Sequence, residues 1–287
     1  MIWLLFSILT AFCDSWKDVL SKKNVSEFDP YVVAWALKVF ALPFLLPFLF
    51  VIDIPKLNSS FWIALFVSGG LNILTAILYM KALQNSELSL TIPMITFTPL
   101  FLLVTSPIIV GEFPTAVGAI GVLFIVVGSY ILNNKERNKG LLAPLRALIR
   151  QRGPRLMLFV AFLWSITSNF DKVGVKNSSP LFWCISVVIF ISFCMIPIIE
   201  KRLHQIGFKQ FLSQKNFFIM GFFYSLTLIF QMTAISLTLV AYVIAIKRLS
   251  VLLGVLWGYF IFKEKAVQER LLGATIMVMG VVLICLF

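Results

Sequence analysis

Long apolar stretches recur along almost the whole chain. A helix that crosses a lipid bilayer needs about 20 consecutive, mostly apolar residues. Backbone groups in lipid must be satisfied within the protein, so stretches of this length favour helices. The sequence contains ten such stretches, at 2–21, 31–52, 61–81, 88–110, 115–133, 156–174, 181–199, 217–236, 240–262 and 269–286. We therefore predict an all-α membrane protein with ten transmembrane helices.

The composition supports this class and excludes others. Hydrophobic residues make up 60% of the chain and charged residues 13%, whereas soluble domains hold about 45–50% apolar and about 25% charged residues. A net charge of +12 would suggest nucleic-acid binding in a soluble protein, but here it indicates basic loops beside a membrane. The four cysteines lie in apolar stretches without a CxxC pair, so no metal site and no cofactor are predicted.

The two halves of the chain resemble each other. An offset of 152 residues aligns them without a gap from Gly69 onward, matching Gly69 with Gly221, Thr75 with Thr227, Glu112 with Glu264, Gly121 with Gly273, and Gly128 with Gly280. Upstream, an offset of 154 places residues 16–19 over 170–173. Five helices is an odd number, so the second copy enters the membrane upside down. We predict two inverted five-helix repeats, at 1–133 and 156–287, within one membrane domain.

Residues 134–155 separate the repeats and are strongly basic. Leucines alternate there with arginines at helical spacing, which is typical of an amphipathic segment on a membrane surface. This linker and the loops on the same side of the membrane hold 17 of the 24 Lys and Arg residues. Such an excess marks the cytoplasmic side. The sequence therefore predicts a multi-pass protein of a bacterial-type inner membrane, with both termini outside.

Short motifs recur in the same order in both halves. The first half carries Ala82, Pro99, Gly111-Glu112, Gly121 and Gly128; the second carries Ala234, Ala245 to Ser250, Lys263-Glu264, Gly273 and Gly280. Over its whole length the chain resembles the drug/metabolite transporter superfamily, specifically its EamA-like members. The resemblance implies a ten-helix carrier of amino acids, metabolites or related solutes. In one departure from the repeat, Val251 stands where the second half would match Pro99.

Charged residues inside the predicted spans are the candidates for a transport site, because a charge at mid-bilayer costs about 2.5–3.5 kcal/mol. The basic ones are Lys17, Lys38, Lys172, Lys247 and Arg248. The adjacent pair Lys247 and Arg248 needs a partner, which could be Asp14, Asp171 or a bound anion. This pair resembles the anion-binding pair of the related triose-phosphate translocators. The alternative is that both side chains snorkel to the membrane surface.

Polar residues at helical spacing complete the candidate site. In the first helix, Asp14 and Lys17 lie on one polar face and are close enough to neutralise each other. A second polar stripe appears in both repeats, as Asn72, Thr75 and Tyr79 and as Tyr224, Thr227 and Gln231. The alternative for each stripe is that it only binds neighbouring helices. The predicted substrate-binding set is Asp14, Lys17, Asn72, Thr75, Tyr79, Asp171, Gln231, Lys247 and Arg248.

No catalytic constellation is recognisable, so the sequence predicts no enzyme. We expect a secondary transporter that moves a small polar or anionic metabolite (an amino acid, an organic anion or a phosphorylated compound) by alternating access. Its partners would be that substrate, the bilayer, and protons or a counter-substrate, without nucleic acid. The alternative is a membrane-embedded enzyme or flippase acting on a lipid phosphate. Glu112 and Glu264 precede helices and are interpreted as helix caps, with proton coupling as the alternative.

Overall fold

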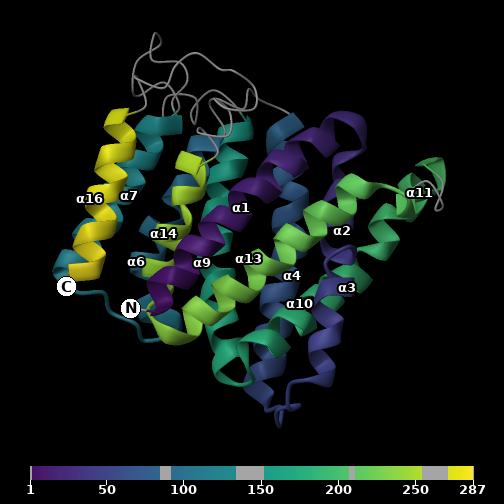
Figure 1. The fold of residues 1–287 in the computed structure, drawn as a ribbon, viewed down its shortest axis with the longest axis horizontal. Coiled ribbons are helices and arrows are strands. Elements are labelled where there is room, and N and C mark those ends of the chain that lie inside the picture. The colour runs from purple at the N-terminus through teal and green to yellow at the C-terminus, as the bar shows by residue number, and fades with distance from the viewer. Residues whose placement is uncertain (1, 85–91, 134–151, 207–210, 254–270, 287) are drawn as a thin grey trace.

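The computed structural model describes residues 2–84, 92–133, 152–206, 211–253 and 271–286, and every regular element within them is a helix (Figure 1). The first half contains α1 (Ile2–Glu27), α2 (Pro30–Val39), α3 (Leu42–Leu45), η1 (Leu46–Phe50), α4 (Ser59–Gln84), η2 (Ile92–Phe97), α6 (Thr98–Ile109) and α7 (Ala116–Asn133). The second contains α9 (Arg152–Lys176), α10 (Pro180–Cys194), α11 (Ile196–Ile206), α13 (Lys215–Leu237), α14 (Val240–Lys247) and α16 (Leu271–Leu286).

Two predicted helices are broken in the structure. The stretch at 31–52 divides into α2, α3 and η1, with Pro43 and Pro47 in the first turns of the last two. The stretch at 181–199 bends by 56° between α10 and α11, where Pro197 follows the break. Proline lacks a backbone N–H and clashes with the preceding turn, so a straight continuous helix is disfavoured at these places.

Not every predicted span is a long apolar helix by itself. Among the described residues, four helical segments have the length and apolar character to cross a membrane: Pro30–Phe50 (α2, α3 and η1 together), Ser59–Tyr79, Arg152–Lys176 and Lys215–Leu237. The bent α10–α11 pair makes a fifth if it crosses as a unit. The apolar helices at Met94–Ile109, Ala116–Ile131 and Leu272–Leu286 are shorter. The part of the predicted span 240–262 beyond residue 253 and most of the linker 134–155 lie outside the described residues; residues 152–155 begin α9. The count of ten spans stays a prediction.

Helices from opposite halves pair side by side in antiparallel directions. Along α1 and α13, Phe6 stacks near Phe230 and Trp16 near Phe223, with ring centroids 6.0 and 5.9 Å apart. Residue numbers rise along one helix while they fall along the other, and Figure 1 shows the two helices adjacent. In the repeat, α1 corresponds to α9 and α4 to α13, so the extensive α4–α9 contact is the counterpart of this pair.

The last helices of the two repeats, α7 and α16, also lie together (Figure 1). A Cβ added to Gly121 would lie 2.7 Å from the carbonyl oxygen of Gly280, and one added to Gly128 would lie 2.6 Å from that of Gly273. Each contact is the repeat-related counterpart of the other, because Gly121 corresponds to Gly273 and Gly128 to Gly280. They also require α7 and α16 to run antiparallel, as an inverted repeat does.

Candidate functional site

A group of charges joins α1 to α14, with Asp14 buried, Lys17 and Lys247 half-buried, and Asp18 exposed. Nζ of Lys17 lies 2.8 Å from Oδ1 of Asp14 and 2.8 Å from Oδ1 of Asp18. Oδ1 of Asp14, a residue that is 5% exposed, also lies 3.5 Å from Nζ of Lys247. The structure thus brings Lys247 to Asp14 rather than to Asp171, and the contact crosses from one repeat to the other. Buried charges are tolerated when they are paired in this way.

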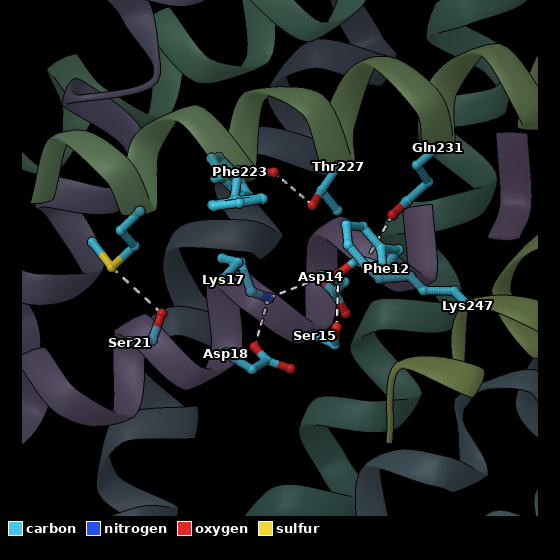
Figure 2. Close-up of polar contacts among 12 residues, drawn as sticks. Phe12, Asp14, Ser15, Lys17, Asp18, Ser21, Phe223, Thr227, Gln231 and Lys247 are labelled. Carbon is cyan, nitrogen blue, oxygen red and sulfur yellow. Dashed lines mark hydrogen bonds and ion pairs between the residues drawn. The ribbon is translucent and has the colours of Figure 1, made fainter. Parts of the chain in front are cut away.

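Helix α13 supplies a third side to the same group. Lys247 donates a hydrogen bond to Oε1 of Gln231 at 2.9 Å. Figure 2 shows Lys17, Asp14, Gln231 and Lys247 converging from α1, α13 and α14. Because Gln231 and Lys247 are 16 residues apart across the α13–α14 turn, only the antiparallel return of the chain places them in contact.

Arg248 is left without a partner in this group. Its Nε atom is buried and makes no hydrogen bond, and among the described residues no carboxylate forms an ion pair with it. Arg248 is also the residue at which α14 ends in a turn. A buried guanidinium N–H without an acceptor is costly, because it has lost water and gained nothing. The arrangement therefore offers a free cation next to Lys247.

Asp171 belongs to a separate hydrogen-bonded group. Its Oδ1 accepts a bond of 2.6 Å from the Ser68 hydroxyl of α4 and one of 3.1 Å from Nε1 of Trp183 of α10. Asn72 lies behind Ser68, with Nδ2 at 3.2 Å from the hydroxyl oxygen. Asp171 forms no ion pair with any of the described residues. The structure therefore divides Asp171 and Lys247, which the predicted substrate-binding set combined, between two groups.

The remaining stripe residues mainly contact neighbouring helices or their own backbone. Thr75 accepts a hydrogen bond of 3.1 Å from Nε1 of Trp164, and the ring of Tyr79 lies 5.9 Å from that of Trp164. Thr227 donates to the carbonyl of Phe223 one turn earlier. For Thr75 the contact with Trp164 favours the alternative that this stripe binds a neighbouring helix, whereas Thr227 bonds within its own helix.

Lys38 of α2 has a partner that the sequence did not indicate. It donates a hydrogen bond to the hydroxyl of Tyr224, and its Nζ lies 4.2 Å from the centre of that ring. Lys38 was recognisable as a charge inside a span and Tyr224 as part of a polar stripe, but their helices are far apart in sequence. Their pairing places another cation near the middle of the molecule without using a carboxylate.

Glu112 caps a different helix from the one predicted. Its Oε2 accepts a bond of 2.9 Å from the backbone N–H of Val240, the first residue of α14, while Oε1 lies 3.0 Å from Nζ of Lys172. Lys172 also donates to the carbonyls of Ile235 and Thr238 at the end of α13. The capping interpretation was wrong about the helix: Glu112 binds the N-terminus of α14 in the other repeat rather than that of α7. Glu264 lies outside the described residues.

Removing one partner of the Glu112–Lys172 pair should destabilise the protein. We expect Lys172→Met to lower the unfolding free energy by about 3–5 kcal/mol, because Glu112 would stay buried without its cation. Adding Glu112→Gln to Lys172→Met should recover part of the loss, since the amide carries no charge. The midpoint of thermal unfolding in detergent measures the stability of both the single and the double variant. A double variant as unstable as the sum of the single changes would contradict a direct interaction.

These features define a helical membrane protein that holds charged residues between two related halves. The sequence matches the EamA-like transporter family over residues 1–134 and 151–286. The chain therefore belongs to the EamA-like transporter family, whose members are membrane transporters of small molecules. The match covers both repeats, in agreement with the internal similarity of the two halves.

A solved structure has a fold similar to that of this chain. A structure described as "Crystal structure of protein" is similar over 99% of this chain and 96% of that chain, with a TM-score of 0.69 and 13% sequence identity. At that identity the likeness concerns the fold alone. A search of curated proteins returned no significant match.

Proposed function

We propose that this protein is a secondary transporter that carries a small polar or anionic metabolite across a bacterial-type inner membrane by alternating access. The observation that carries the proposal is Arg248 beside Lys247, because its Nε atom is buried without a hydrogen bond and it has no ion-pair partner among the described residues. An arginine binds a carboxylate or phosphate through two parallel hydrogen bonds, and a lysine adds a point charge. An amino acid, an organic anion or a phosphorylated compound could each supply the anionic group.

Carboxylates pair with two of the lysines when no substrate is bound. Asp14 holds Lys17 and Lys247, and Asp18 holds Lys17. A bound anion would satisfy Arg248 and compete with Asp14 for Lys247, so the free and loaded sites each keep Lys247 paired. Buried cations without partners would otherwise be costly.

The position of the group suits alternating access. Asp14 lies in the first repeat, while Gln231 and Lys247 lie in the second. A rocking motion of one repeat against the other would change the distances between these residues, and a substrate that prefers one arrangement would shift the equilibrium. We propose that the ten predicted spans surround this group, with the site between the repeats.

The test is a ligand screen followed by a flux assay. Purified protein in detergent would be heated with amino acids, organic acids, sugar phosphates and nucleotides, because a specific ligand raises the unfolding midpoint by mass action. Each stabilising compound would then be tested, radiolabelled, for counterflow in proteoliposomes. Saturable counterflow supports a transporter. Hydrolysis of a lipid phosphate by the same proteoliposomes, or flipping of that lipid without counterflow, would instead favour the enzyme or flippase alternative.

The excess of basic residues on one side predicts the orientation. A reporter fused after Phe287 should behave as non-cytoplasmic, and a reporter inserted near Lys139 should behave as cytoplasmic. Paired fusions to alkaline phosphatase, active outside, and to a fluorescent protein that folds inside give opposite signals at each position. If both positions report the reverse side, the proposed orientation is wrong and the transport proposal is unaffected.

A further inference from the structure

Asp171 is a buried carboxylate that the proposed binding group does not use. The residue is 7% exposed, and the side chains that donate hydrogen bonds to it are the neutral Ser68 and Trp183. Two neutral hydrogen bonds compensate part of the desolvation of an ionised carboxylate, whereas a protonated carboxyl group needs much less compensation. The site can therefore exist in a charged and an uncharged form without a change of partners.

The surroundings of Asp171 leave it responsive to charge at the binding group. The titratable groups that act on it are Lys38 from α2, Lys247 from α14, Tyr224 from α13 and Cys184 from α10. The residues of α4 at this carboxylate, Ser68 and Asn72, are uncharged, and Thr105 and Ser106 of α6 bind Asn169 of α9 instead. Lys247, which belongs to the proposed anion site, is therefore one of the cations whose charge acts on Asp171.

The hydrogen bonds at Asp171 connect the two repeats. Asn72 is partly exposed and donates to the Ser68 hydroxyl, which in turn donates to Asp171. Because Ser68 lies in the first repeat and Asp171 in the second, these bonds cross the interface that alternating access must rearrange.

We propose that Asp171 is the proton-binding residue of this transporter, and that one proton is carried together with the anionic substrate; this rests on the proposed function. Four cations, Lys17, Lys38, Lys247 and Arg248, lie among three carboxylates, of which Asp14 and Asp171 are buried and Asp18 is exposed. Protonation of Asp171 raises the excess positive charge from one to two. The proton therefore strengthens anion binding, and by linkage the anion strengthens proton binding by the same factor.

The flux experiment uses radiolabelled glutamate, succinate and glucose 6-phosphate in proteoliposomes, with the membrane potential clamped by valinomycin and potassium. For the wild-type protein, an inward-directed acid gradient should raise accumulation by up to about tenfold per pH unit if one proton accompanies each anion. Asp171→Asn should retain counterflow but lose this stimulation, because the amide binds no proton. Asp53→Asn, at an exposed residue, is the matched control and should keep both the counterflow and its stimulation by the acid gradient.

A spectroscopic measurement decides the same question without a substrate. Infrared difference spectra of the wild-type protein, taken between roughly pH 5 and pH 9, should contain a carboxyl C=O band that Asp171→Asn removes and Asp171→Glu shifts. Persistence of the gradient effect in Asp171→Asn, or of an unchanged titrating band, would overturn the proton site. If none of the three anions is transported by the wild-type protein, the choice of substrate fails, while the infrared result still tests Asp171.

Discussion

Replacing Lys247 and Arg248 together by alanine is expected to abolish transport while the protein still inserts and purifies. Removing a charged partner from a buried, hydrogen-bonded contact costs about 2–5 kcal/mol of binding, so the affinity for the anion should fall by at least about 30-fold. Lys247→Ala alone should have most of the effect, since Lys247 also binds Asp14 and Gln231. Counterflow measures the loss of transport, and ligand-induced thermal stabilisation measures the loss of affinity for the anion.

Arg248→Lys separates charge from geometry. A lysine keeps the positive charge but cannot make two parallel hydrogen bonds to a carboxylate or phosphate. If Arg248 binds the anion as proposed, this variant should lose affinity with little loss of stability, because Arg248 gives up no ion pair within the part of the chain that the structure describes.

The chain offers a matched control for the double substitution. Lys201 and Arg202 are also an adjacent Lys-Arg pair, and they lie on α11 with Lys201 exposed. Arg202 forms a half-exposed ion pair with Asp29 at 3.4 Å, a kind of contact worth about 1 kcal/mol or less. Lys201→Ala with Arg202→Ala should transport normally. Wild-type transport by the Lys247→Ala, Arg248→Ala protein would show that this pair is structural and that the anionic-substrate proposal is wrong.

Alanine at the glycines between α7 and α16 should cause a large loss of stability. A Cβ at Gly128 would lie 2.6 Å from the carbonyl oxygen of Gly273, and a Cβ at Gly280 would lie 2.6 Å from that of Gly121. The obstacle is backbone in both cases, so the helices must move apart. Overpacking of this kind costs about 1–3 kcal/mol at each site, and Gly128→Ala with Gly280→Ala should therefore lower the unfolding midpoint strongly.

Gly70→Ala provides the control for these substitutions. Gly70 lies within α4, and a Cβ there would meet nothing within 4 Å. Alanine favours a helix over glycine by about 1 kcal/mol, so this variant should be as stable as the wild-type protein or more so. Should Gly128→Ala behave like Gly70→Ala, the close approach of α7 and α16 would not describe the folded protein.

The helical class and the repeat of the two halves were predictable from the sequence because each depends on local patterns. Apolar runs of about 20 residues leave the backbone few alternatives in lipid, and glycines at matching positions reveal the duplication. The same information did not show how prolines divide the stretch at 31–52, because a proline inside an apolar stretch can kink a helix or end it. Neighbouring helices decide which occurs.

The partners of the charges depended on the tertiary structure. Sequence identified Lys247, Arg248, Asp14 and Asp171 as charges inside spans, and left the acid that binds Lys247 open. Asp14 is that acid because α1 contacts α14, and Asp171 is held by Ser68 and Trp183 because α9 contacts both α4 and α10.

Glu112 shows the same division between local and long-range information. Its place before α7 suggested a cap for that helix, but its carboxylate binds Val240 and Lys172 of the other repeat. The sequence alone determined which residues carry charge or polarity into the membrane, since that is a matter of residue type and position in a span. Which of them meet was decided only by the tertiary structure, because ion pairs and hydrogen bonds act over a few ångströms between segments that are distant along the chain.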